Sequence, residues 1–329
     1  MTERVSVALC THNGARFVGE QLRSILAQST TPDEIVLSDD ASTDDTVAIA
    51  TTLVDSAALP GLDFVVLRNP VALGVTANFE GAIRATTGDL IVLSDQDDLW
   101  HPDRLSRALR EFAARPELDL VFGNARLVDA SGADLERSLF DVLEVTEHDL
   151  KALHRGDGLS VFIRRNIATG ATVMFRRRLL DVALPFPSGW VHDEWLAMLA
   201  AAIGQLDALS DRLIDYRQHG SNLIGVDYPT FRRKVRRALE PRGERNARLA
   251  TQFAQLATRL DSTPTPMPPD VLAKVRTKAA FEGFRKALPA VRPRRLWRVL
   301  AANRRGWYAE FASQGRLDMV RDLLQPHGE

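Results

Sequence analysis

Apolar and polar positions alternate in two ways along this 329-residue chain, and together they predict an α/β fold. Short apolar blocks bounded by turn residues predict strands at residues 5–10, 35–38, 64–67, 90–94, 118–122, 126–128, 169–175 and 213–216. Between them, apolar residues at helical spacing predict amphipathic helices, among them 17–28, 75–85 and an apolar helix over 196–203. The strand–helix rhythm favours a mostly parallel sheet with helices on both faces. In such sheets, ligands bind beyond the carboxyl ends of the strands.

Three polar clusters follow predicted strands at that edge. They occupy residues 11–14, 39–43 and 95–98. One acidic loop has little meaning alone, but three polar clusters on one sheet edge indicate a nucleotide site. The chain has no GxGxxG after its first strand and no GxxxxGK[ST], so neither a Rossmann dinucleotide site nor a P-loop is supported.

The third cluster lies in the stretch LIVLSDQDDLW, residues 90–100. A strand predicted to be buried on both faces ends there in Asp95, Asp97 and Asp98. Three carboxylates repel one another, and a hard cation such as Mg²⁺ or Mn²⁺ would relieve that repulsion. The alternative is a solvated acidic loop that caps the next helix, because carboxylates are favourable at helix starts.

Charge is distributed unevenly, although the formal net charge is only −1. Residues 231–329 contain 22 Lys and Arg against 9 Asp and Glu, whereas the rest of the chain is acidic. This asymmetry predicts two units with different roles, an acidic one at 1–228 and a basic helical region at 229–329. The single cysteine, Cys10, and the lack of a charged-then-apolar leader favour a cytoplasmic protein.

Seven motifs in order are similar to one enzyme family. VSVALCTHNG, IVLSDDASTDDT, LGVTANFEGAI and LIVLSDQDDLW resemble the family-two glycosyltransferases of GT-A fold, which are inverting, metal-dependent enzymes that use nucleoside diphosphate sugars. TGATVMF, HDEW and DYRQHGSN resemble the branch that includes bacterial rhamnosyltransferases of cell-surface polysaccharide assembly. The resemblance runs from about residue 4 to about residue 225. It implies a GT-A nucleotide-sugar-binding fold followed by the basic helical region.

The resemblance also implies roles for individual residues at the donor side. Its nucleotide-binding positions are Thr11, Asn13, Asp39, Asp40, Asn78 and Asp95. Asp95 and Asp97 form the DxD pair, and Asp97 is the direct ligand of Mg²⁺ or Mn²⁺. His219 is a second residue expected at the metal. Arg217 is a candidate contact for the diphosphate, because a guanidinium can meet phosphate oxygens as a fork.

The general base implied by the resemblance is Asp193, in the HDEW motif. Without the resemblance, an Asp at a helix start is more often a simple cap. His192 stands where many members have an acidic residue, and Glu194 is a rival base.

The function predicted from the sequence is transfer of a sugar to a growing cell-surface glycan. The expected donor is dTDP-rhamnose, with a UDP-sugar as the alternative, and the acceptor is a glycan or a lipid-linked glycan. Two other classes are alternatives: a DxD phosphatase or phosphotransferase, whose DxD would follow the first strand, and a nucleic-acid-binding protein. The acidic front half, with no recognisable nucleic-acid module, speaks against the second.

The basic region from about residue 229 onward begins with five Lys or Arg between positions 232 and 237. Three apolar stripes follow, the third comprising Leu296, Trp297, Leu300, Trp307, Tyr308 and Phe311. The region is either a helical appendage packed on the catalytic domain or a peripheral face for an anionic membrane. In the second case the protein would lie on the cytoplasmic face of the inner membrane.

Overall fold

The computed structural model describes residues 3–219, 245–263 and 267–325. The chain divides into two compact units, Met1–Gly158 with Ile167–Val226, and Leu159–Asn166 with Asp227–Glu329. The predicted boundary at 228/229 lies outside the described residues, as does the basic run at 232–237. Along the described part of the chain, no helix combines the length and apolarity needed to cross a bilayer.

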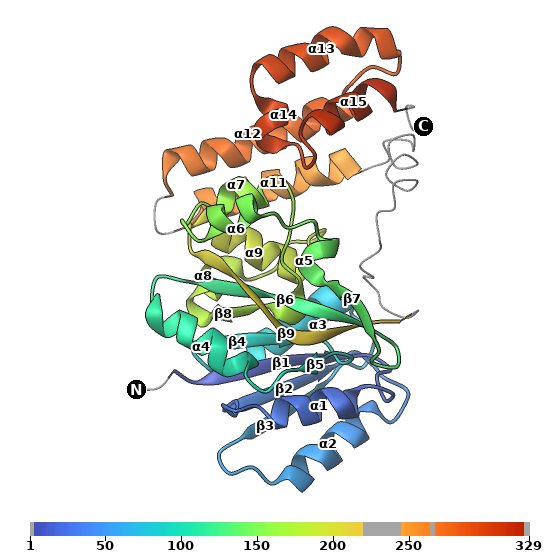
Figure 1. The fold of residues 1–329 in the computed structure, drawn as a ribbon, viewed down its shortest axis with the longest axis vertical. Helices are drawn as coiled ribbons and strands as arrows, with labels where there is room; N and C mark the ends of the chain where they lie inside the picture. Colours follow the sequence, from blue (N-terminus) through green and yellow to red (C-terminus); the bar gives the residue numbers. More distant parts are fainter. Residues whose placement is uncertain (1–2, 220–244, 264–266, 326–329) are drawn as a thin grey trace. The chain divides into compact units, whose positions relative to one another are not determined.

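The first unit is built on a nine-stranded sheet with the order β3-β2-β1-β4-β8-β6-β9-β5, and β7 pairs with β6 (Figure 1). Its parallel half comprises β1 (Val5–Thr11), β2 (Glu34–Asp39), β3 (Asp63–Arg68) and β4 (Leu90–Ser94). The helices of this half are α1 (Val18–Leu26), α2 (Thr46–Ala57) and α3 (Val75–Ala85). Strands β1, β2 and β4 are buried along their whole length, as their continuous apolar blocks predict.

The helices of this half cover the sheet from both sides. Helices α1 and α2 contact each other, whereas α3 packs on β1, β2 and α9 (His192–Ala202). Right-handed crossovers explain this arrangement, because the chain moves outward from β1 to β3 and then returns to β4. The parallel sheet predicted from the sequence is confirmed for this half.

The other half of the sheet mixes strand directions. It contains β5 (Leu99–Trp100), β6 (Leu120–Asp129), β7 (Asp134–Ser138), β8 (Met174–Arg176) and β9 (Leu206–Gln218). Strand β8 runs antiparallel to β4 and β6, and β6 runs parallel to β9. The two short strands predicted at 118–122 and 126–128 are one strand, β6. Its register with β9 shifts around Asn124, and β6 stays paired with β9 on both sides of that shift. The strand predicted at 169–175 is a 3₁₀ turn, η1 (Gly170–Thr172), followed by the short β8.

Short helices fill the regions between the strands. They are α4 (Arg104–Ala114), α5 (Leu139–Val142), α6 (Glu147–Leu153), η2 (Arg177–Leu179) and α8 (Leu180–Ala183). Helix α7 (Gly158–Phe162) belongs, from Leu159 onward, to the second unit. Capping boxes start α5 and α6, in which Ser138 pairs with Asp141 and Thr146 pairs with Asp149. The sequence pattern alone did not place the elements of residues 141–166.

The second unit is helical. It contains α11 (Arg245–Asp261), α12 (Pro269–Lys286), α13 (Arg292–Arg304), α14 (Trp307–Phe311) and α15 (Arg316–Leu324) (Figure 1). Phe281 on α12 lies at its centre, with the rings of Tyr308 and Phe311 packed around it. The third predicted stripe is therefore divided: Tyr308 and Phe311 are buried, whereas Leu296 and Trp297 are exposed.

Candidate active site

The ends of β1, β2 and β4 bring the three predicted polar clusters to one edge of the sheet. Thr11 pairs with Asp39 in the register of β1 and β2, and Ser94 lies beside Leu9. The Thr11 hydroxyl donates to Asp39 Oδ1 at 2.8 Å, and Ser42 donates to the same carboxylate through its amide and its hydroxyl. The side chain of Asp39 is thus fixed at the centre of this edge.

Asp40 and Asn78 shape the wall beside Asp39. The Asp40 carboxylate accepts from the amides of Leu73 and Gly74 at 2.7 and 2.9 Å and from Asn69. Burial alone would raise the pKa of Asp40, but these hydrogen bonds together outweigh it and lower the pKa. Asn78 bonds both to the Ser38 hydroxyl and to the Ser38 carbonyl. Both residues therefore hold the loop before α3 against the end of β2.

The turn after β1 is tied to the acidic cluster by Gln96. Gln96 accepts from the His12 amide at 2.9 Å and donates to the His12 carbonyl. A Cβ at position 14 would lie 2.1 Å from Gln96 Oε1, so a larger residue there would have to displace the Gln96 side chain. Asn13 has a φ of 48° and accepts from the Thr43 amide, so it joins this turn to the one after β2. The motif analysis did not single out Gln96.

At the end of β4, Asp98 is buried, and Asp95 and Asp97 beside it are half-buried. Burial, followed by the charges of Asp97 and Asp193, raises the pKa of Asp95 to about 7. Burial also raises the pKa of Asp97, although His219 opposes part of that effect. The pKa of Asp98 is raised well above its usual range by burial and by the other two carboxylates. A solvated acidic loop would show none of these shifts.

His219 reaches the acidic cluster from the end of β9. Its Nε2 lies 2.9 Å from Asp97 Oδ2, and its ring stacks on Phe17 at 4.7 Å between ring centres. Two residues earlier, the Arg217 amide donates to Asp98 Oδ1 at 3.0 Å. The structure thus brings together the two residues that the sequence nominated for a metal, although they are 122 positions apart.

Asp97 and His219 fit a cation that is shared with a substrate. Within residues 3–219, 245–263 and 267–325, no three His, Cys, Asp or Glu side chains form a ready-made metal cage. Mg²⁺ and similar ions, however, often take one or two protein ligands and complete their shell with water and substrate phosphates. In addition, Asp98 Oδ2 is buried and has no hydrogen-bond partner among the described residues. The Asp97 carboxylate and the His219 imidazole are a suitable pair of protein ligands for such a shared ion.

The guanidinium of Arg217 is engaged by the protein. Its Nε donates to the Asp97 carbonyl at 2.9 Å, and its two terminal nitrogens donate to the Ala130 carbonyl and to Glu20. It also lies over the ring of Phe17. In this arrangement Arg217 supports the loop that contains Asp97, and the predicted diphosphate contact stays a prediction.

Asp193 lies in the first turn of α9 and is oriented by backbone amides. Gly170 donates to Asp193 Oδ2 at 2.8 Å, and the Glu194 amide donates to Oδ1 at 2.7 Å. A Cβ at Gly170 would stand 3.0 Å from His192 Nε2 and 3.4 Å from Asp193 Cβ, so a glycine allows this approach. Because the Asp193 charge acts on Asp95, the predicted base and the DxD pair belong to one site.

His192, beside the predicted base, is a buried ring. It stacks on Phe79 with 3.9 Å between ring centres, and neither ring nitrogen has a hydrogen-bond partner among the described residues. Burial lowers the pKa of His192, although Asp193 opposes this shift. The neutral ring therefore packs under the site without adding charge to it.

Arg104 is a residue of this site that the sequence analysis missed. It is buried at the start of α4, where it stacks 3.6 Å from the ring centre of Trp100. One terminal nitrogen donates to the Ala171 carbonyl at 2.6 Å and to the Leu93 carbonyl at 3.3 Å. Burial lowers its pKa to about 9, so it remains a cation beneath the carboxylates. Its place on the apolar face of α4, with Leu105, was the available signal.

Comparison with known proteins agrees with this geometry. The sequence profile described as Glycosyl transferase family 2 matches residues 6–183, more than half of the chain. The chain belongs to glycosyltransferase family 2. Membership of this family removes the support for a DxD phosphatase or a nucleic-acid-binding protein.

Two curated relatives indicate how far the similarity extends. An uncharacterized glycosyltransferase of Nostoc sp. is 26% identical over 228 residues, which cover 67% of this chain and 66% of that protein. The match therefore spans just under two thirds of that relative's length. The dTDP-rhamnosyl transferase RfbG of Shigella flexneri is 27% identical over 239 residues, which cover 70% of this chain and 77% of that protein.

A solved structure shows the same fold. The mannosyltransferase PcManGT from Pyrobaculum calidifontis, in complex with GDP-Man and Mn²⁺, aligns with a TM-score of 0.55 at 20% identity. The alignment covers 97% of this chain and 86% of that one. The predicted GT-A fold is confirmed.

Proposed function

We propose that this protein is a metal-dependent, inverting glycosyltransferase that moves a sugar from a nucleoside diphosphate donor to a glycan acceptor. The observation that supports this most directly is the meeting of Asp97 and His219 at 2.9 Å, in the same site as Asp193. Family membership supports the reaction class, and the buried acidic cluster supports the metal.

In this proposal Asp193 is the general base. It takes the proton of the acceptor hydroxyl while that oxygen attacks the anomeric carbon, and the bond to the diphosphate breaks on the opposite face of the sugar. Each Asp193 oxygen accepts one backbone amide, which fixes the carboxylate and leaves each oxygen a lone pair for the hydroxyl.

Asp97 and His219 would hold Mg²⁺ or Mn²⁺ together with diphosphate oxygens. A bound divalent cation supplies charge neutralisation for the departing diphosphate. His219 is held in place by its stack on Phe17, and the Asp97 loop is held by Arg217. Asp95, the first member of the DxD pair, is proposed to contact the nucleotide.

The nucleotide would bind over the ends of β1 and β2. Thr11, Asn13 and Asp39 are proposed to hydrogen-bond the base and ribose, with Asp40 and Asn78 shaping the wall beside them. The amide edge that such groups recognise is common to thymine and uracil, so dTDP-rhamnose is the proposed donor and UDP-sugars are the alternative. The similarity to RfbG, a dTDP-rhamnosyl transferase, favours the first.

The proposed acceptor is a glycan or lipid-linked glycan of the cell surface, met at the cytoplasmic face of the membrane. A soluble disaccharide acceptor would not require the basic helical unit, whereas a lipid-linked acceptor would give that unit a role in binding at the membrane.

A panel of nucleotide sugars tests the proposal. Purified protein with Mn²⁺ is mixed in turn with dTDP-rhamnose, UDP-glucose, UDP-galactose, UDP-N-acetylglucosamine and GDP-mannose, and thermal shift and nucleotide release are recorded. We expect the largest effects with dTDP-rhamnose. Greater turnover of another sugar would overturn the donor and leave the transferase, whereas no shift and no release with any sugar would contradict both.

A further inference from the structure

Helix α15 has its polar and apolar faces reversed relative to an ordinary surface helix. Asp318 and Asp322 are both completely buried, whereas Leu317, Val320 and Leu324 are 65%, 45% and 51% exposed. The spacing of these three apolar residues places them on one side of the helix. An ordinary surface helix would pack its leucines against the protein and expose its carboxylates to water.

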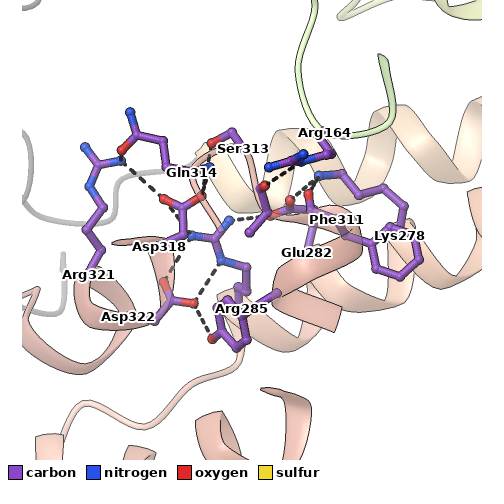
Figure 2. Close-up of polar contacts among 12 residues, drawn as sticks. Arg164, Lys278, Glu282, Arg285, Phe311, Ser313, Gln314, Asp318, Arg321 and Asp322 are labelled. Carbon is purple, nitrogen blue, oxygen red and sulfur yellow. Dashed lines mark hydrogen bonds and ion pairs between the residues drawn. The ribbon is translucent and has the colours of Figure 1, made fainter. Parts of the chain in front are cut away.

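A cluster of ion pairs inside the unit accommodates the buried acids (Figure 2). Arg285 donates to both Asp322 oxygens at 2.9 and 3.2 Å, and Tyr308 donates to Asp322 Oδ2 at 2.7 Å. Asp318 accepts from the Ser313 hydroxyl at 3.0 Å and pairs with Arg321. The negative charge of α15 is therefore neutralised internally and is absent from the surface.

Helix α13, which packs against α15, exposes a tryptophan among arginines. Arg295 and Val299 are buried, and Trp297, on the opposite side of the helix, is 73% exposed. By the helical repeat, Arg294 and Arg304 flank Trp297 on that exposed side. Tryptophan beside basic side chains is the combination found where helices meet lipid headgroups.

The exposed charge of this region is predominantly positive. Residues 286–325 contain nine Lys and Arg against three Asp and Glu, and two of the three acids are those buried on α15. The exposed basic residues are Lys286, Arg292, Arg294, Arg298, Arg304, Arg305 and Arg316. Glu310 is the one exposed acid in this span, all of which the structure describes.

We propose that the exposed sides of α13 and α15, hereafter the α13–α15 face, bind an anionic lipid surface. Basic residues would meet the headgroups, and Trp297, Leu317, Val320 and Leu324 would enter the interfacial layer. Nucleic acid would use the arginines but not the leucines, and a second copy of the same face would bring like charges together. Only the biological role of this membrane binding rests on the proposed function, and that role would be to bring the enzyme to a lipid-linked acceptor.

Vesicle co-sedimentation of the full chain, without nucleotide sugar, tests this inference. Vesicles of phosphatidylcholine alone are compared with vesicles of equal parts phosphatidylcholine and phosphatidylglycerol. We expect binding to the anionic vesicles, with release by salt because screening weakens headgroup attraction. Since no substrate is present, failure of the transferase proposal would leave this result unchanged.

Surface variants then locate the binding. Arg294→Ser with Arg304→Ser is expected to weaken binding about 25-fold, on the scale of two arginines near an anionic leaflet. Trp297→Ser should weaken it about 10-fold, and Leu317→Ser with Val320→Ser should act similarly. The matched control is Arg23→Ser with Arg110→Ser, two exposed arginines of the first unit. It removes the same charge elsewhere.

Three results would overturn the inference. They are equal binding to neutral vesicles, no binding to either kind, and equal weakening by the control pair. Self-association that Trp297→Ser abolishes, without vesicle binding, would instead assign the face to a second copy. Because the altered side chains are exposed, melting curves should match the wild type, and the α15 variants provide a second route if Trp297→Ser does not fold.

Discussion

At the scale of single residues, Asp193 is the side chain on which the proposed proton transfer depends. Two backbone amides hold its carboxylate in place, so Asp193→Asn should keep the geometry while removing the base. We expect kcat to fall by about 10²-fold or more, with donor affinity nearly unchanged. Steady-state kinetics with calorimetry of the donor measures both. Glu194→Gln is the matched control, and a larger loss there than in Asp193→Asn would move the base by one residue.

His192 makes a prediction about pH. Because burial lowers its pKa in the folded state, the unfolded chain takes up a proton first as the pH falls, and stability is lost below about pH 6.5. His192→Phe keeps a ring against Phe79 and removes this titration. The melting temperature of His192→Phe should therefore rise relative to that of the wild type as the pH falls through this range.

The control for this comparison is His148→Gln, since His148 is exposed. It should leave the pH dependence of melting as in the wild type. If the melting temperatures of wild type and His192→Phe run parallel at every pH, burial does not keep the His192 ring neutral.

At the scale of elements, sequence periodicity predicted what local patterns determine. Residues 90–94 and 75–85 form the strand and the helix expected for them, because a continuous apolar block and an amphipathic repeat suffice. The turn η1 could not be predicted in this way. It exists because Arg104 holds the Ala171 carbonyl and Gly170 donates to Asp193, and both partners are remote in sequence.

The candidate site was predicted to a similar extent. Motif order nominated Asp97, His219 and Asp193, which the structure brings to one site. It could not identify Arg104 or Gln96, because their roles come from tertiary contacts. Nor could it show that Arg217 is engaged by Glu20.

The turn after β1 and the end of β4 should be energetically coupled through Gln96. Gly14→Ala would place a methyl group against Gln96 and displace it from His12, so nucleotide affinity should fall. Gln96→Ala removes the obstacle, and the double variant should be less impaired than the two single changes added together. A double-mutant cycle of nucleotide binding should give a coupling of about 1–2 kcal/mol. Strict additivity would show that the contact is not used in binding.

At the scale of the whole molecule, the chain combines an acidic sheet-based unit with a basic helical unit whose stability depends on buried ions. Asp322→Asn would remove the carboxylate that lies nearest to the buried Arg285, with Glu282 and Asp318 farther away at 3.4 and 3.8 Å, and we expect a loss of about 3 kcal/mol in the unfolding free energy of that unit. Urea denaturation measures it, with Glu310→Gln as the exposed control. Arg285→Met combined with Asp322→Leu removes both charges and should recover part of the loss. An Asp322→Asn variant as stable as the wild type would contradict this account of the unit.

Asp97 and His219 are proposed to form a metal-dependent donor site. Titration calorimetry of dTDP and of UDP into the wild type and Asp97→Asn, each with Mn²⁺ or with chelator, tests it most directly. Removal of one carboxylate weakens a hard-cation site and relieves repulsion in the cluster, so the variant should fold with equal or greater stability. We predict that the wild type binds nucleotide only with Mn²⁺ and that Asp97→Asn binds in neither condition. Undiminished Mn²⁺-dependent binding by Asp97→Asn would contradict the account.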